Sequence, residues 1–228
     1  MCNTPPLVVV PARVHHAYMI IGRILHSEDC MKEGAAWLGA REPRFAHALD
    51  LCGPPPLRRR PDGFEALMGA IVSQQVSVAA ARAIWARLEG AGLTTPEAIA
   101  AADDDALRAG GLSRQKIRYI RALAAAGIDF DALRHEPDAE IVERLIVVPG
   151  IGRWTAEIYA MFSLGRADVF APNDLALQES ARMLFDLPDR PREAALRRMA
   201  EDWSPWRTVA AGLLWAYYRV AKDREGIA

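Results

Sequence analysis

The chain has 228 residues, of which 51% are hydrophobic, so it can bury the core of one domain or of two small lobes. The formal net charge is -1, from 28 basic and 29 acidic residues, which excludes strong attraction to polyanions through bulk charge. A nucleic-acid binder with this composition must concentrate its positive charge on one face.

The cysteines and the hydropathy indicate the redox state of the compartment and whether the chain enters a membrane. Cys2, Cys30 and Cys52 have no metal-ligand spacing, and their odd number and wide gaps indicate reduced intracellular thiols. No apolar run reaches the roughly 18 residues that cross a bilayer, and the N-terminus lacks the pattern of a secretory signal. We therefore expect a soluble cytoplasmic protein that does not bind a membrane.

The composition favours an all-α fold, because Ala, Leu, Arg and Glu dominate and β-branched residues form only short runs. Residues 1–34 are expected to form an N-terminal extension of uncertain structure. A helical pattern follows Met31, and three prolines at 54–56 then make a firm break, since proline cannot continue a helix.

From residue 64 onward, the spacing of hydrophobic residues predicts a series of helices separated by capping residues, glycines and prolines. Ser77 and Thr95 are expected to cap helices, because their side-chain oxygens accept hydrogen bonds from first-turn N–H groups. In chain order, the predicted helices cover approximately residues 64–74, 78–89, 96–101, 104–109, 113–126, 138–146, 154–164, 175–185, 193–202 and 208–222.

A glycine-containing turn at 148–153 (VPGIGR) separates two of these helices. Pro149 stops the first helix, and we expect Gly150 and Gly152 to adopt backbone conformations closed to other residues. Such a turn, leading into a helix N-terminus, presents N–H groups that accept an anion such as a DNA phosphate. Taken alone, this pattern is more often a plain loop between packed helices, so its flanks decide the interpretation.

Together with its flanks, the turn resembles the hairpin of the helix-hairpin-helix (HhH-GPD) DNA glycosylase superfamily, and specifically its 3-methyladenine DNA glycosylase II (AlkA-type) branch. The resemblance covers roughly residues 35–220, with the motifs in the right order and spacing. The segments that carry it are 71–79 (IVSQQVSVA), 111–122 (GLSRQKIRYIRA), 145–156 (LIVVPGIGRWTA), 168–174 (DVFAPND) and 203–215 (WSPWRTVAAGLLW).

The resemblance implies a two-lobed all-α fold with the active site in the cleft between the lobes. Residues 62–166 would form one lobe, which carries the helix-hairpin-helix at about 141–164. Residues 35–61 and 167–228 would together form the other lobe.

Asp174 corresponds to the catalytic aspartate of this family. Breaking the bond between the sugar C1′ and a base gives the sugar oxocarbenium-like positive charge, which a nearby carboxylate stabilises while it orients a water. The local sequence alone favours a helix N-cap at Asp174, although Asn173 can fill that role instead. We expect Asp168 to be a solvated loop residue.

A base inside a stacked duplex is unreachable, so the nucleotide must be flipped out. Trp154 and Trp215 match the pocket tryptophans of the family, and aromatic faces attract cationic alkylated bases. Ile158 stands where a well-known relative has tyrosine, with Tyr159 beside it. Each tryptophan has core packing as its alternative role. For Trp85, Trp203 and Trp206, core or lobe packing is the expected role.

Two further sets of residues follow from the resemblance. Gln74 and Gln75 occupy the turn that pushes a wedge into the base stack, with Gln75 at the wedge position; the alternative is a polar helix end. The predicted phosphate ligands are Gly150, Gly152, Arg153, Thr155, Arg114 and Lys116. The basic helix that carries Arg114 and Lys116 has a solvated face as its alternative, and Arg58–Arg60 is a further candidate.

The sequence lacks two features that some members of the family have. Bifunctional relatives place a lysine just after the hairpin to form a Schiff base with the sugar, and here that position is Trp154. No cysteine follows Cys52, so a four-cysteine iron–sulfur cluster is not expected. The resemblance therefore implies a monofunctional enzyme without a metal cofactor, although a monovalent cation at the hairpin stays open.

The expected partner is double-stranded DNA with damaged bases, bound by a monomeric, nucleoid-associated protein. The main alternative is a non-catalytic helix-hairpin-helix module that binds DNA structure and needs no carboxylate at Asp174. A glycosylase with lyase activity is a second alternative. A helical enzyme unrelated to DNA is a third, and no metal, nucleotide or nucleophile motif supports it.

Overall fold

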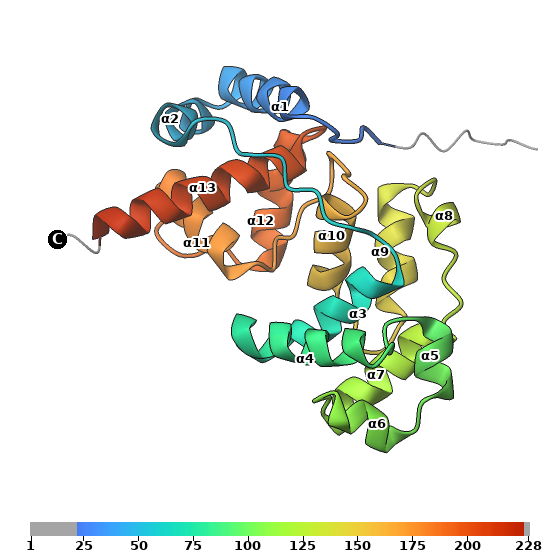
Figure 1. Ribbon diagram of the computed structural model, residues 1–228. Coiled ribbons are helices and arrows are strands. Elements are labelled where there is room, and N and C mark those ends of the chain that lie inside the picture. Colours follow the sequence, from blue (N-terminus) through green and yellow to red (C-terminus); the bar gives the residue numbers. More distant parts are fainter. Residues whose placement is uncertain (1–21, 226–228) are drawn as a thin grey trace, which may run out of the picture.

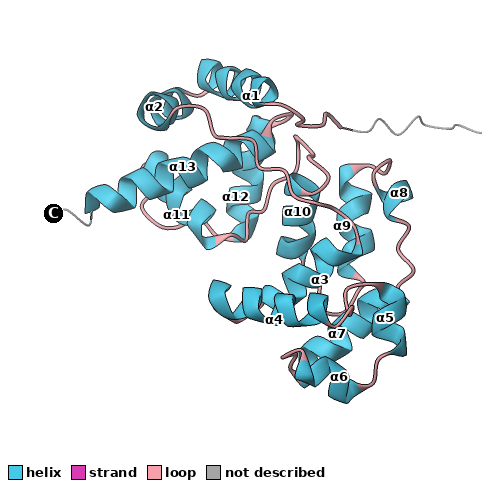
Figure 2. Ribbon diagram, viewed as in Figure 1, coloured by secondary structure: helices cyan, strands magenta, loops and turns pink. Residues whose placement is uncertain are grey.

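The computed structural model describes residues 22–225, which fold into helices joined by turns and loops (Figures 1 and 2). Within this range the β pairing is limited to an isolated antiparallel bridge between Ile24 and Arg166. The all-α prediction is therefore confirmed. None of the described helices is both long and apolar enough to cross a bilayer.

One group of helices packs around the long C-terminal helix α13, which contacts α1, α2, α11 and η1. α12 joins this group through its contacts with α11 and η1. The members are α1 (Glu28–Arg41), α2 (Pro43–Cys52), α11 (Leu175–Leu184), α12 (Glu193–Met199), the 3₁₀ helix η1 (Ala200–Trp203) and α13 (Arg207–Glu225).

The remaining helices form a second group, in which α3 packs against α4, α7 and α10, and α9 packs against α10. Both α5 and α6 pack on α7. The members are α3 (Phe64–Ser73), α4 (Val78–Gly90), α5 (Pro96–Ala101), α6 (Asp104–Ala109), α7 (Arg114–Ala125), α8 (Phe130–Leu133), α9 (Asp138–Ile146) and α10 (Arg153–Phe162).

Local capping explains why most of these helices begin where they do. Ser77 and Thr95 each accept a hydrogen bond from a first-turn N–H group, as predicted. Ser113, predicted as the first residue of its helix, is the N-cap of α7. Ser27 caps α1 in the same way, so α1 begins at Glu28, inside the region predicted as an extension. Residues 1–21 of that extension lie outside the described residues.

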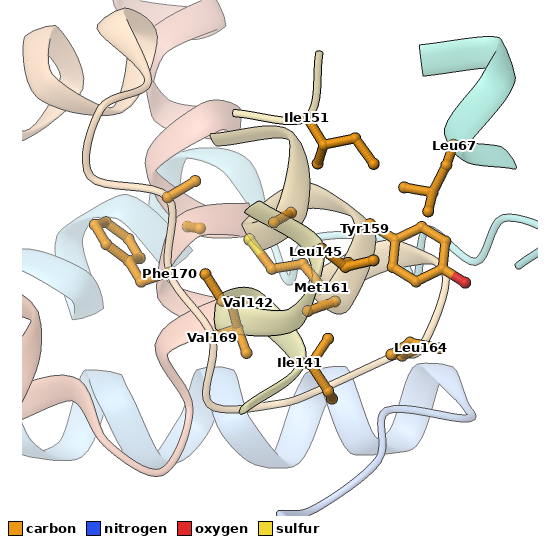
Figure 3. Packing of buried hydrophobic residues seen from close by; sticks show 14 of the residues in the cluster. Leu67, Ile141, Val142, Leu145, Ile151, Tyr159, Met161, Leu164, Val169 and Phe170 are labelled. Carbon is orange, nitrogen blue, oxygen red and sulfur yellow. The ribbon is translucent and has the colours of Figure 1, made fainter. Parts of the chain in front are cut away.

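Buried hydrophobic side chains form a core that runs through both groups of helices. Behind the hairpin, Leu145, Tyr159 and Met161 pack together (Figure 3). Trp203 and Trp206 are buried as expected, whereas Trp85 is only partly buried. The expectation for Asp168 is wrong: its carboxylate accepts two hydrogen bonds from the Arg207 guanidinium and a third from Ser204.

The segment at 57–60 crosses from one group of helices to the other and is fixed along its length. The Leu57 N–H donates to the Glu28 carboxylate, and the Arg60 N–H donates to the Phe162 carbonyl. Between them, Arg59 donates to the carbonyls of Leu25 and Ser163. These contacts hold the neighbouring side chains of Arg58 and Arg60 on a rigid backbone.

Candidate active site

Asp174 lies at the start of α11 and is half-buried. Its Oδ1 atom accepts hydrogen bonds from the N–H groups of Ala176 and Leu177, both at 3.0 Å. Asp174 is therefore the N-cap itself, and the suggestion that Asn173 fills this role is wrong. The cap aligns the carboxylate with the positive end of the helix dipole.

Two tryptophans from different groups of helices also hold the Asp174 carboxylate. The Trp154 indole N–H, at the start of α10, donates to Oδ2 at 3.1 Å. The Trp215 indole N–H, in α13, donates to Oδ1 at 3.3 Å. Because an indole is a donor only, both contacts use an acceptor oxygen of the carboxylate and fix its orientation.

A cavity of about 280 Å³ opens at this carboxylate, between the two groups of helices. Its walls bring together residues from α10, α11, α13 and the 57–60 segment: Asp174, Trp154, Ile158, Phe162, Trp215, Tyr218, Arg219, Arg58 and Arg60. Trp154 is 43% exposed, which leaves its ring accessible from the cavity. We call this space the Asp174 cavity.

A neighbouring cavity of about 610 Å³ shares Arg60, Trp154 and Ile158 with the Asp174 cavity. It extends between α3 and α10, where Tyr159 lines it. Tyr159 is buried, its hydroxyl accepts a hydrogen bond from the Gly63 N–H at 2.9 Å, and burial raises its pKa to about 12. Its ring packs in the core (Figure 3), and it does not line the Asp174 cavity.

The hairpin joins α9 to α10, and its two glycines differ. Gly150 has a φ of 94°, and a Cβ there would overlap the ring of Tyr119, so only glycine fits. Gly152 has φ -81° and ψ 164°, which any residue adopts, so the expectation of a special conformation is wrong there. A Cβ on Gly152 would meet nothing within 4 Å.

Gly152 is also the N-cap of α10 and makes no side-chain cap. The N–H groups of the first turn of α10 therefore lack the side-chain acceptor that a serine or aspartate would supply. With no side chain at Gly152, the helix end stays open to an approaching anion.

The α3–α4 turn is attached to this hairpin. The Gln74 side-chain amide donates to the Gly150 carbonyl at 2.9 Å, and the Lys116 ammonium donates to the Val72 carbonyl at 2.7 Å. Gln75 has a φ of 55° and is exposed at the apex of the turn. Of the two glutamines, Gln75 is thus the one whose side chain stays accessible.

The other predicted phosphate ligands lie in different environments. Arg114 is exposed at the start of α7, and Arg153 is paired with Glu143 at 2.7 Å. The Thr155 side chain is buried, so only its backbone is placed to meet a ligand at the helix end. Burial lowers the pKa of Lys116, whose ammonium contacts the end of α3.

Sequence reasoning missed Phe162, Tyr218 and Arg219 as walls of the Asp174 cavity. A signal for two of them was present, because residues three and four positions after Trp215 lie on the same face of a helix. Phe162 stands eight residues after Trp154 and four after Ile158, so one stripe of α10 lines the cavity.

The sequence also matches the model of a known family. Residues 68–205 match the HhH-GPD superfamily of base excision DNA repair proteins. The chain belongs to this superfamily. The matched region begins in α3 and ends just before α13, so it contains the hairpin and Asp174.

Several HhH-GPD relatives are similar over most of the chain. DNA-3-methyladenine glycosylase 1 of Schizosaccharomyces pombe is 35% identical over 69% of this chain and 73% of its own length. DNA-3-methyladenine glycosylase 2 of Escherichia coli is 34% identical over 68% of this chain and 57% of its own length.

Solved structures of HhH-GPD proteins agree with the fold. DNA-3-methyladenine glycosidase from Bacillus halodurans superposes with a TM-score of 0.77 at 33% identity, covering 83% of this chain and 91% of that one. The S. pombe 3-methyladenine DNA glycosylase Mag1, in complex with abasic DNA, gives a TM-score of 0.69 at 31% identity, covering 80% and 95%.

Proposed function

We propose that this protein is a DNA glycosylase that hydrolyses the N-glycosidic bond of alkylated bases flipped out of duplex DNA. This reaction is the first step of base excision repair. The observation that carries the proposal is the Asp174 carboxylate, held by two tryptophan indoles at the mouth of a cavity. The names of its 3-methyladenine glycosylase relatives support the same reaction.

Asp174 is the proposed catalytic residue. Cleavage of the bond between C1′ and the base nitrogen leaves positive charge on the sugar, and a carboxylate beside C1′ stabilises that charge. Asp174 also orients the water that adds to C1′ and accepts its proton. The base leaves with the bonding electron pair. An alkylated purine is already cationic, so no strong general acid is needed.

The two cavities give the flipped nucleotide a place on either side of Trp154. We assign the sugar to the Asp174 cavity and the base to the neighbouring space beside Trp154 and Ile158. An aromatic face attracts a cationic base by about 0.5–2 kcal/mol. This attraction favours 3-methyladenine-type lesions, and ethenoadenine and hypoxanthine are further candidate substrates.

The hairpin and the α3–α4 turn supply the proposed contacts to DNA. The N–H groups around Gly152 bind a backbone phosphate, which positions the protein without reading sequence. Gln75 enters the gap left by the flipped base, because its side chain is exposed at the tip of the turn. Gln74 instead holds this turn to the hairpin.

The remaining properties follow from the same proposal. The enzyme leaves an abasic site without cutting the strand, since Trp154 occupies the position of the lyase lysine. It acts as a monomer on damaged duplex DNA in the cytoplasm, at the nucleoid. It needs no iron–sulfur cluster or other cofactor.

The test is base release from duplex DNA that has been treated with a methylating agent. We expect the purified protein to release 3-methyladenine-type bases and to leave alkali-sensitive abasic sites in intact strands. Borohydride treatment should trap no covalent adduct, and a trapped adduct would reveal a lyase. Binding to damaged DNA with no base release would contradict the proposal and favour a non-catalytic DNA-binding module.

A further inference from the structure

Three arginines line the Asp174 cavity and come from two separate elements. Arg58 and Arg60 belong to the 57–60 segment, and Arg219 lies in α13. All three are exposed. Among the described residues, no carboxylate lies within ion-pair distance of any of them, although many other arginines of the chain are paired.

Asp174 forms no ion pair with these arginines, and its single negative charge can offset at most one of their three positive charges. Its two oxygens are occupied by the backbone N–H groups of α11 and by the two indoles. The cavity therefore contains one engaged carboxylate and three guanidinium groups without an anionic partner. In a chain with a net charge of -1, such a concentration of unpaired positive charge indicates a site for an anion.

Two of these arginines, Arg58 and Arg60, lie on a fixed backbone. Arg59, between the other two, donates to the carbonyls of Leu25 and Ser163 and so fixes the backbone of the segment. The Arg60 guanidinium lies 5.5 Å from the centre of the Phe162 ring, and this ring is 5.7 Å from that of Trp215. Stacking on an aromatic face leaves the N–H edge of a guanidinium free to donate.

The proposed chemistry requires that these charges be neutralised. Positive charge develops on the sugar next to Asp174, and three unpaired guanidinium groups beside it would oppose that development. Phosphates bound to these guanidinium groups remove the conflict. The phosphates on either side of a flipped nucleotide are the anions that the substrate itself brings to this cavity.

We propose that Arg58, Arg60 and Arg219 form a binding site for the backbone phosphates that flank the flipped nucleotide. This inference rests on the proposed function. The planar N–H fork of arginine matches phosphate oxygens in pairs. The site therefore grips the strand only when the nucleotide is out of the stack, whereas the hairpin also binds undamaged duplex.

The test compares the Arg58→Gln/Arg219→Gln double variant with wild type, in binding to two duplexes at several salt concentrations. One duplex carries a tetrahydrofuran abasic analogue and the other is undamaged. We expect about a tenfold loss of affinity per arginine on the analogue duplex. The slope of log K against log salt should fall by about 1.8 on that duplex, and far less on the undamaged one.

Two control variants sharpen the result. Arg198→Gln removes an exposed arginine on α12, away from the cavity, and should leave both affinities and the slope unchanged. Arg58→Lys/Arg219→Lys keeps the charges, so it should retain most of the slope while losing part of the affinity. Urea unfolding of each variant tests whether the fold is intact.

An unchanged slope in the glutamine variant, or an equal loss on both duplexes, would overturn the inference. Inorganic phosphate at millimolar concentration should compete only weakly with the analogue duplex. If phosphate displaced the duplex at micromolar concentration, the arginines would instead form a binding site for a free anion, and the inference would be wrong. Failure of the proposed function looks different: wild-type protein would release no alkylated base, whatever the binding data for the arginine variants.

Discussion

The two faces of α10 differ in what they contact: one packs in the core and the other lines a cavity. One face is closed by packing: Ala156 and Ala160 are fully buried, and Glu157 is 2% exposed. The other face, with Trp154, Ile158 and Phe162, lines the Asp174 cavity. The closed face holds the helix in position, and the open face presents aromatic surface to a ligand.

The charged residues near the two faces of α10 also differ in whether they have a partner. On the closed face, one oxygen of the Glu157 carboxylate accepts a hydrogen bond from Arg197 of α12 at 2.9 Å. On the open side, the arginines of the Asp174 cavity have no anionic partner among the described residues. A charge that is paired within the protein has its partner already, and one that is left unpaired in a cavity is available to a ligand. Substitutions on the two faces should therefore have different effects.

The largest expected effect is a loss of stability on substitution of Gly150, which is packed against Tyr119 in the hairpin. Gly150→Ser forces a side chain into a left-handed conformation and into the Tyr119 ring. We expect the free energy of unfolding to fall by about 3 kcal/mol, from the sum of backbone strain and overpacking. Urea unfolding followed by circular dichroism measures this. A loss below about 1 kcal/mol would mean that the hairpin is not tightly packed there.

Removing the partner of Glu157 should have the next largest effect. Arg197→Ala leaves a buried carboxylate without its cation, which costs about 2 kcal/mol at pH 7. The double variant Glu157→Gln/Arg197→Ala should recover part of this loss. If the single and double variants were equally stable, Glu157 would not be a buried charge.

The same pair predicts a pH dependence. Burial raises the pKa of Glu157 above its usual value, and Arg197 opposes that rise. Because the folded protein then binds this proton more tightly than the unfolded chain, ionised Glu157 lowers stability as the pH rises above about 4. The cost of Arg197→Ala should therefore be larger at pH 7 than at pH 4.5. A cost independent of pH would contradict this reasoning.

Substitution of Gly152, the other glycine of the hairpin, should affect DNA binding and leave stability nearly unchanged, the opposite of what we expect at Gly150. Gly152→Ser adds a good N-cap residue in a conformation that serine adopts freely, so stability should change by less than about 0.5 kcal/mol. Its side chain would occupy the N–H groups and the space proposed for a phosphate. We expect DNA affinity to fall by about tenfold in a fluorescence anisotropy titration. Unchanged affinity would exclude a phosphate contact here.

The last expected effect, no larger than that of Gly152→Ser, concerns one hydrogen bond in the Asp174 cavity. Trp154→Phe keeps an aromatic face but removes the indole N–H that donates to Asp174. We expect the single-turnover rate of base release to fall by about tenfold, with stability nearly unchanged. An unchanged rate would show that Trp215 and the helix N-terminus are enough to orient the carboxylate.

The sequence predicted the features that depend on neighbouring residues. Ser77 and Thr95 cap their helices as expected, because an N-cap acts on N–H groups within three positions. The turn at Gly150 was recognised for the same reason. The short helix α8 was not anticipated, since four residues give too little periodicity to detect.

Features that depend on distant partners were not predictable. Nothing near Asp168 in the sequence shows that Arg207 pairs with it, and nothing near Glu157 indicates Arg197. The arginines of the Asp174 cavity come from 57–60 and α13, which only the fold brings together. The ordinary backbone conformation of Gly152 was not predictable either. Glycine suits this position because it has no side chain, and not because of its φ angle.

The central claim is that the carboxylate of Asp174 performs the chemistry, and Asp174→Asn tests it most directly. Asparagine can still cap α11, so the variant should remain folded and should bind abasic-analogue DNA with near wild-type affinity. We predict that its single-turnover rate of base release from methylated duplex DNA falls by at least about 100-fold. Release at the wild-type rate by a folded, DNA-binding Asp174→Asn protein would contradict the account.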